Sequence, residues 1–253
     1  GAGRMQATLG YLRRADQDFN LIEAGDRIAV GVSGGKDSLL LLKALALYRH
    51  VRGDFTLRAI MLTMGEQAPD TAAIRAYSEG LGVPIEIRHT ELYQILQAKC
   101  AGQSPCPLCA KLRRAMLAEA CTELGCNKLA LGHHRDDALE TFLMSLLFEG
   151  RLHTFQPRTA LTGSGVTVIR PLIFMPEREI LSAQRRLSLP VLESVCPVNG
   201  HTRRQEMKQL LRDLARRYPR LQENMLAALR NDAQYGLWQK TPRTGAQEPP
   251  PEA

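Results

Sequence analysis

Aromatic residues are scarce in this chain of 253 residues, at 5% of the sequence with a single tryptophan. The sequence therefore gives no clear sign of a surface on which single-stranded bases stack against aromatic side chains. No apolar run approaches the length that spans a bilayer, no charged-then-apolar segment marks a secretory signal, and no internal repeat is visible. These absences argue against a helical membrane protein or a repeat protein, and we expect a cytoplasmic protein.

The charge of the chain is unbalanced, with 33 Lys and Arg against 26 Asp and Glu and a net charge of +7. This excess, with an isoelectric point of about 9.3, suits a polyanionic partner such as nucleic acid. The sequence also holds six cysteines. In a cytoplasmic protein they argue against a disulfide framework and for metal or redox chemistry at some of them.

The most informative segment is the glycine-rich string Gly31-Val32-Ser33-Gly34-Gly35-Lys36-Asp37-Ser38. It follows an apolar run that predicts a strand and precedes a leucine-rich helical pattern. A strand, a tight turn and a helix N-terminus together present backbone N–H groups and the positive end of a helix dipole to an anion. Lys36 adds a positive charge, and the two serines add hydroxyl donors. The segment therefore predicts a phosphate-binding loop.

This loop is not a Walker A motif, because Val30 stands where that motif requires glycine and Asp37 follows the lysine in place of Ser or Thr. It instead resembles the PP-loop of the ATP pyrophosphatases, whose pattern is SGGxDS. That resemblance implies cleavage of ATP between the α- and β-phosphates, with AMP transferred to a substrate oxygen and pyrophosphate released. A plain strand-to-helix turn is the alternative, and the full SGGKDS string favours the nucleotide interpretation.

Apolar periodicity predicts an α/β fold built on a parallel sheet, with a helical extension at the C-terminal end. Strands are expected over 27–32, 57–62, 85–87, 128–131 and 166–169, and helices between them over 37–49, 70–81, 91–99, 108–124 and 135–149. Helices alone follow, over about 177–188, 202–217 and 219–231. Residues Gly1 to Arg4, ahead of Met5, are left out of the reasoning about the fold. We expect a nucleotide-binding domain over 20–175, a basic helical region over 176–235 and a disordered tail over 241–253.

Two cysteines in the pattern CxxC, Cys106 and Cys109, open the long predicted helix. The pattern can place two thiolates on one metal, and a helix N-terminus favours their deprotonation. One such pair is an incomplete site, and Cys196, in another loop before a helix, is the best third ligand. The alternatives are a redox pair, half of a zinc site, or incidental thiols. Cys121 and Cys126 flank a helix end and are expected in the core or a turn.

Two further motifs carry charge. The string Gly132-His133-His134-Arg135-Asp136-Asp137 closes the fourth strand, where it could bind metal or simply place acids in the first helical turn. Glu140 continues that helix and is expected on the surface. A basic stripe recurs every four residues on one later helix, and its members are Arg204, Lys208, Arg212 and Arg216. We expect it to contact nucleic-acid phosphates because acidic residues near it in sequence are few, and a merely solvated face is the alternative.

Taken together, these strings resemble the tRNA 2-thiocytidine synthetase family (TtcA), from Phe19 to about Asn231. The matches include SGGKDS, CPLCAKLRR (106–114), LGHHRDD (131–137), IRPL (169–172) and LRD (211–213) followed by RYP (217–219). The chain departs from the family where the later loop keeps only Cys196 of a second CxxC. It also departs at the end of the second predicted strand, where the family has an Asp near Thr63.

The resemblance implies an ATP-dependent iron–sulfur enzyme that converts an anticodon-loop cytidine, at tRNA position 32, to 2-thiocytidine. It implies a [4Fe–4S] cluster on Cys106, Cys109 and Cys196, with Mg²⁺ at Asp37 and catalytic roles for Lys36, Asp37, Arg113 and Asp137. The expected ATP contacts are Ser33, Gly34, Gly35, Lys36, Asp37, Ser38, Thr63, Gly132 and His133. Expected partners are tRNA, ATP and a sulfur donor such as a cysteine desulfurase, and a homodimer is left open.

Two other classes of protein share some of these features. One is another PP-loop tRNA enzyme, either a 2-thiouridine-type thiolase or a lysidine-synthetase-like ligase that needs no cluster. The other is a non-catalytic, zinc-stapled RNA-binding protein with a relict nucleotide loop. The cysteine set argues against the ligase, and the intact SGGKDS string argues against the non-catalytic protein.

Overall fold

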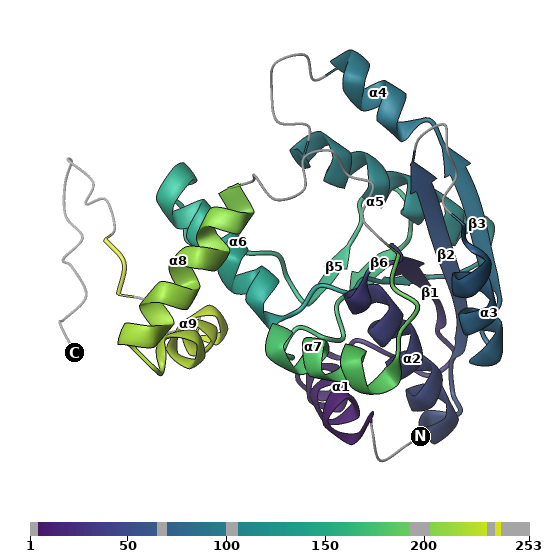
Figure 1. Cartoon of the computed structure of the whole chain (residues 1–253), viewed down its shortest axis with the longest axis horizontal. Coiled ribbons are helices and arrows are strands. Elements are labelled where there is room, and N and C mark those ends of the chain that lie inside the picture. Colours follow the sequence, from purple (N-terminus) through teal and green to yellow (C-terminus); the bar gives the residue numbers. More distant parts are fainter. Residues whose placement is uncertain (1–4, 65–69, 100–105, 193–202, 232–235, 239–253) are drawn as a thin grey trace, which may run out of the picture.

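The protein is an α/β structure built on one twisted sheet (Figure 1). Its computed structural model describes residues 5–64, 70–99, 106–192, 203–231 and 236–238. The sheet has six strands in the order β3-β2-β1-β4-β6-β5. The strands are β1 (Arg27–Val32), β2 (Thr56–Met64), β3 (Ile85–Thr90), β4 (Lys128–Ala130), β5 (Arg158–Ala160) and β6 (Thr167–Ile169). Neighbouring strands are parallel except β5, which pairs antiparallel with β6 at the edge.

The five strands and the helices predicted from periodicity are confirmed, with boundaries that differ by a few residues. The helices are α1 (Gln6–Phe19), α2 (Lys36–Arg52), α3 (Ala72–Gly80), α4 (Leu92–Lys99), α5 (Cys106–Glu123), α6 (Arg135–Glu149), α7 (Glu177–Leu187), α8 (Arg203–Arg217) and α9 (Leu221–Arg230). Two elements were not predicted, namely helix α1 and the edge strand β5. The expected tail over 241–253 lies outside the described residues.

The two faces of the sheet are buried against different helices. Ile28, Val30 and Val32 of β1 face a large core that α1, α2 and α7 complete, whereas Ala29 points the other way, to a smaller core under α5. This alternation follows from the two-residue period of a strand. Cys121 of α5 and Cys126 just after it are buried in the smaller core, which confirms that they are core residues.

Helix α1 is fixed to the rest of the molecule by polar contacts. The Asp16 carboxylate accepts hydrogen bonds from the Tyr48 hydroxyl (2.8 Å) and from the Arg52 guanidinium (2.9 Å), both on α2. At the other end of the chain, Arg230 of α9 donates to the Asp18 carboxylate of α1 (2.7 Å) and lies over the Phe174 ring. The first and last described helices are therefore joined directly.

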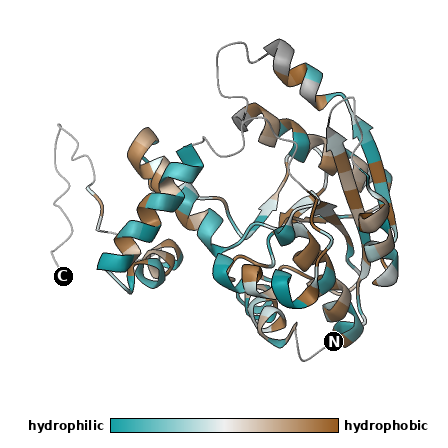
Figure 2. Ribbon diagram, viewed as in Figure 1, coloured by the Kyte–Doolittle hydropathy of each residue, from teal (hydrophilic) through white to brown (hydrophobic). Residues whose placement is uncertain are grey.

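The helices after β6 divide into two groups. Helix α7 packs against α2, while α8 and α9 lie beside α6, away from the sheet (Figure 1). Figure 2 shows α8 mostly hydrophilic, and its apolar residues Met207 and Leu211 are buried. In the described ranges, no helix combines the length and apolar composition that a membrane crossing requires.

Candidate active site

The glycine-rich loop joins β1 to α2 at the carboxyl edge of the sheet. The amide of Ser33 donates to the Ser38 hydroxyl (3.0 Å), which in turn donates to the Gly35 carbonyl (3.0 Å). Gly34 has a φ of +82°, a conformation that glycine adopts without strain. The serine contacts thus hold a tight turn directly ahead of the first residue of α2, where the helix dipole favours an anion.

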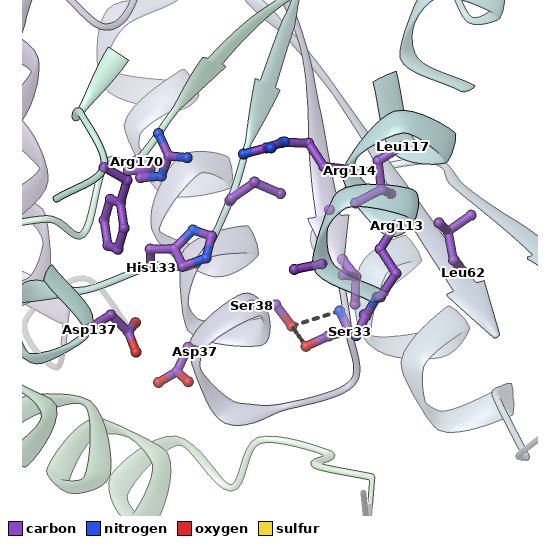
Figure 3. A pocket seen from close by; sticks show the side chains of 16 residues that line it. Ser33, Asp37, Ser38, Leu62, Arg113, Arg114, Leu117, His133, Asp137 and Arg170 are labelled. Atoms are coloured by element: carbon purple, nitrogen blue, oxygen red, sulfur yellow. Dashed lines mark hydrogen bonds between the residues drawn. The ribbon is translucent and has the colours of Figure 1, made fainter. Parts of the chain in front are cut away.

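A pocket of about 380 Å³ opens in front of this loop (Figure 3). That volume falls within the range of sites that bind small molecules. It is lined by residues from both halves of the sheet and from α2, α5 and α6, namely Gly31, Val32, Ser33, Asp37, Ser38, Leu62, Ala110, Arg113, Arg114, Leu117, Leu131, Gly132, His133, Asp137, Phe155 and Arg170. The structure therefore brings together Ser33, Asp37, Ser38, Arg113, Gly132, His133 and Asp137 of the predicted site residues.

Four predicted nucleotide contacts do not line the pocket, namely Gly34 and Gly35 of the glycine-rich loop, Thr63 and Lys36. Thr63 is buried and its hydroxyl is paired with the His89 ring at 2.7 Å, so it does not line the pocket. The Lys36 ammonium lies 3.1 Å from the Asp37 carboxylate and 3.4 Å from that of Glu177, also outside the lining. Burial disfavours the charge of Lys36, but the two carboxylates outweigh burial and raise its pKa. Lys36 is thus a charged lysine held at the side of the pocket.

Gly132 and His133 follow β4, and Gly132 packs against the backbone that follows the glycine-rich loop. A Cβ placed on Gly132 would lie 3.0 Å from the backbone of both Asp37 and Ser38, so only glycine fits there without displacement. Burial lowers the pKa of His133 to about 4, with the charges of Arg170 and Arg204 acting in the same direction. His133 is therefore neutral near pH 7, and its Nδ1 is buried without a hydrogen-bond partner in the described part of the chain.

The acids of the HHRDD string point in different directions. Asp137 lines the pocket, and its carboxylate accepts the His134 amide (2.9 Å) as part of a capping box at the start of α6. Asp136 turns to α7, where it accepts the amide of Glu177 (2.9 Å). Within the described ranges no three or more His, Cys, Asp and Glu side chains gather as a metal site. The assignment of Mg²⁺ to Asp37 stays a prediction.

Glu140 is buried, and the expectation that it lies on the surface was wrong. It is 3% exposed, and its carboxylate contacts the Arg204 guanidinium of α8 at 3.3 Å. Burial and the nearby charge of Asp137 raise the pKa of Glu140 to about 7. The reason for the error is that α8 docks over this face of α6, which the sequence of α6 alone does not reveal.

The basic stripe of α8 also has more acidic partners than its own sequence suggests. Arg204 contacts Glu140, and Lys208 lies 2.6 Å from the Glu177 carboxylate, whose other neighbour is Lys36. These acids come from α6 and α7, so the few acidic residues near the stripe in sequence are joined by partners from distant helices. Arg212 and Arg216 are exposed, and Arg216 pairs with Asp213 at 3.2 Å.

The cysteines can be placed only in part. Helix α5 begins at Cys106, Cys109 is half-buried, and the next residue, Ala110, lines the pocket. Cys196 lies outside the described residues. Four positions before it, the amide of Leu192 donates to the Gly34 carbonyl (2.9 Å), and its side chain lies over Gly34. Leu192 thus lies at the glycine-rich loop four positions before Cys196, and helix α5, which begins at Cys106, borders the same pocket.

Sequence reasoning missed Arg170, which directly follows β6 and lines the pocket although it is 3% exposed. Its guanidinium donates to the Gln156 carbonyl (2.5 Å) and lies over the Phe155 ring. Burial, together with the charge of Arg114, lowers the pKa of Arg170 to about 10. The available signal was a charged residue placed at the carboxyl end of an apolar strand in the IRPL string, where ligands of parallel sheets bind.

Known proteins resemble this chain along most of its length. The family model of the PP-loop domain matches residues 11–196. A tRNA-cytidine(32) 2-sulfurtransferase of Geobacter metallireducens is 43% identical over 222 residues, covering 86% of each chain. One from Pelobacter propionicus is 41% identical, covering 86% of this chain and 82% of its own. The structure of the U34-tRNA thiolase NcsA from Methanococcus maripaludis, with its [4Fe–4S] cluster, superposes with a TM-score of 0.75 at 25% identity, covering 90% and 79% of the two chains.

Proposed function

This chain belongs to the tRNA-cytidine(32) 2-sulfurtransferase family of PP-loop proteins, and on that premise we propose that it thiolates an anticodon-loop cytidine of tRNA with the help of ATP. The observation that carries the proposal is the composition of one pocket. Groups suited to ATP activation, on the glycine-rich loop, and α5, which begins with two thiols, border the same cavity of about 380 Å³. A base bound there could be activated and thiolated without leaving the site.

The first step is activation of a poor leaving group. The C2 carbonyl oxygen of the cytosine attacks the α-phosphorus of ATP, a P–O bond forms, and the bond to the β-phosphate breaks to release pyrophosphate. The helix N-terminus and the Ser33 hydroxyl would hold phosphate oxygens, while the Ser38 hydroxyl, which donates to the Gly35 carbonyl, would keep the shape of the turn. Lys36 would leave Glu177 for the departing pyrophosphate, and Asp37 would hold Mg²⁺.

The second step replaces the oxygen. Sulfide attacks C2, and AMP carries away the original carbonyl oxygen. Arg113 and Asp137 both line the pocket; Arg113 would offset the charge of the departing AMP, and Asp137 would take the proton of the attacking hydrosulfide. Neutral His133 can accept or donate a hydrogen bond beside the base without adding charge.

The donor chemistry fits an iron–sulfur cluster, because thiolates are its usual ligands and a helix N-terminus favours thiolate. Cys106, Cys109 and Cys196 would hold a [4Fe–4S] cluster that supplies the sulfur to be transferred. Cys196 follows Leu192 by four residues, which span at most about 14 Å, so the chain can reach the pocket from the glycine-rich loop. A sulfur donor such as a cysteine desulfurase, which delivers sulfur as a persulfide, would renew the sulfide together with a two-electron reductant such as a thiol.

We also keep as proposals the tRNA stripe of α8, the cytoplasmic location and the division of the chain at residue 176. Arg212 and Arg216 are exposed and available to RNA phosphates, whereas Arg204 and Lys208 would have to exchange acids of this protein for phosphates. A homodimer is not needed by any step described above.

The test of the function uses protein purified without oxygen and unmodified tRNA. Wild type is expected to form AMP, pyrophosphate and 2-thiocytidine in equal amounts, and Lys36→Ala and Asp37→Ala to form none. Nucleoside analysis of the tRNA distinguishes thiolation of a cytidine from thiolation of a uridine. The second reaction must be checked because NcsA, which has a similar structure, is a U34-tRNA thiolase. Thiolated uridine, or a nucleoside without sulfur, would refute the proposal.

The cluster has its own measurement. Iron and acid-labile sulfide should fall sharply in Cys106→Ser, Cys109→Ser and Cys196→Ser. Cys121→Ser and Cys126→Ser, which change thiols in the smaller core, are matched controls that should keep both. A full iron and sulfide content in Cys196→Ser would overturn the three-cysteine ligand set.

A further inference from the structure

Two arginines at one end of the pocket face each other without a carboxylate between them. Figure 3 shows Arg114 of α5 and Arg170 after β6 reaching toward the same end, with Asp37 and Asp137 at the other end. Across the described ranges, neither arginine forms an ion pair with an acid. The charge of Arg114 is close enough to lower the pKa of Arg170. This end of the pocket is therefore positively charged and self-repelling as it stands.

Three other cations near the site are paired with acids of the protein itself, whereas Arg113, on the loop side of the pocket wall, has no ion pair with an acid in the described ranges. Lys36 and Lys208 share the Glu177 carboxylate, and Arg204 contacts Glu140. Arg114 and Arg170 differ from these paired cations, because the protein places no acid beside them in the part of the chain that the structure describes. Burying a guanidinium without a counter-charge costs free energy, and the cost is recovered when an anion binds.

Unsatisfied polar atoms occur at the same end. Arg170 is 3% exposed, and its Nε has no hydrogen-bond partner in the part of the chain that the structure describes. The same holds for Nδ1 of His133, which lies beside Arg170 in the pocket wall. Arg170 is anchored on its other side by the Gln156 carbonyl and the Phe155 ring, so its position is set before a ligand arrives. Such atoms in a cavity wall are available to pair with a bound ligand.

We propose that Arg114 and Arg170, with His133, form a phosphate site for the RNA nucleotide that carries the base to be modified, separate from the loop that takes the phosphates of ATP. The inference rests on the proposed function and adds how the substrate is seated. The glycine-rich loop already offers the triphosphate the Ser33 hydroxyl and the N-terminus of α2, and the arginines lie apart from Ser33, at the far end of the pocket (Figure 3). A nucleotide that enters between α5 and β6 brings its own phosphodiester to this end.

The experiment measures binding of a tRNA anticodon stem-loop over a range of salt concentrations, and binding of ATP, for wild type and two variants. Arg114→Gln removes an exposed side chain and should fold normally, which protects the test if Arg170→Gln does not fold. Each variant should bind the stem-loop about tenfold less tightly and lower the salt slope by about 1, because one phosphate contact is lost. The dissociation constant of ATP should stay the same.

Lys111→Gln is the matched control, because Lys111 is an exposed cation on the same helix that does not line the pocket. The Lys111→Gln variant should leave the salt dependence of stem-loop binding unchanged. If Arg114→Gln instead weakens ATP binding and leaves the RNA slope intact, the arginines serve the ATP phosphates and the proposal is overturned. Unchanged binding of both ligands overturns it as well. These readouts need no turnover, so they remain decisive even if wild type forms no 2-thiocytidine and the proposed function fails.

Discussion

Gly132 offers the sharpest test of how the end of β4 supports the nucleotide loop. In Gly132→Ala the new Cβ would lie 3.0 Å from the Asp37 carbonyl carbon and 3.0 Å from the Ser38 nitrogen. Ordinary contacts of a Cβ begin at 3.4 Å, so the backbone must move by about 0.4 Å, the difference between the two distances. The atoms that must move are backbone atoms of the first turn of α2, and they cannot rotate away as a side chain can.

The expected magnitude follows from two opposed effects. Overpacking costs about 1–3 kcal/mol, while replacing glycine by alanine at a compatible backbone conformation recovers about 0.4–1 kcal/mol through the unfolded state. The net loss in the free energy of unfolding should be about 1–2 kcal/mol. Because the displaced turn is the one proposed to hold the ATP phosphates, ATP affinity should fall at least about threefold, since small misplacements of binding groups are costly.

Urea unfolding and calorimetric titration with ATP measure the two effects. Gly10→Ala is the control, because Gly10 lies inside α1 and a Cβ added there would meet nothing within 4 Å. It should gain about 0.5–1 kcal/mol of stability from helix propensity and leave ATP binding unchanged. A Gly132→Ala protein with wild-type stability and wild-type ATP affinity would refute the steric reasoning.

Two further predictions concern buried or shared acids. The pKa of Glu140 is raised to about 7 in the folded protein. The contribution of Glu140 to the free energy of unfolding is therefore fully present below its pKa in the unfolded chain, near 4.5, and is lost as the pH rises through 7. Glu140→Gln should therefore gain up to about 3 kcal/mol relative to wild type between pH 5 and pH 8 in urea unfolding, and parallel pH curves would contradict this. Glu177→Gln should release Lys36 and tighten ATP binding about threefold in calorimetry, because one of its two carboxylate partners is lost. Glu179→Gln, on the same first turn of α7, is its control, and equal effects of the two variants would show that the ion pair is irrelevant.

The sequence was sufficient for elements whose signal is local. The continuous apolar run of β1 is typical of a strand buried on both faces, the leucine repeat of α2 is typical of a helix, and the glycine-rich string predicts the loop between them. Strand β5 has three residues, too few for any period, and is held as an edge by pairing with β6. Helix α1 has a buried stripe that includes Leu12 and Ala15, but it precedes the segment on which the fold was argued.

The site was predictable as far as it depends on motifs, and not where it depends on docking between distant helices. Asp37 and Asp137 were found because their strings end at strand ends that a parallel sheet must bring together. Glu140 was misplaced because its burial comes from α8, which lies far along the chain and contacts it through Arg204. Arg170 was missed for a related reason. A role for a single arginine after a strand can be inferred only when the residues on the opposite wall of the pocket are known.

The contact between Asp18 and Arg230 joins positions 212 residues apart, and this has a consequence for the order of assembly during synthesis. A ribosome adds about 5–20 residues per second, so the second partner appears about 10–40 s after the first. Strands β1 to β6 are all made before α9, so the sheet can form while α1 still lacks its last neighbour. The contact between α1 and α9 therefore cannot form until the last described helix has been synthesised.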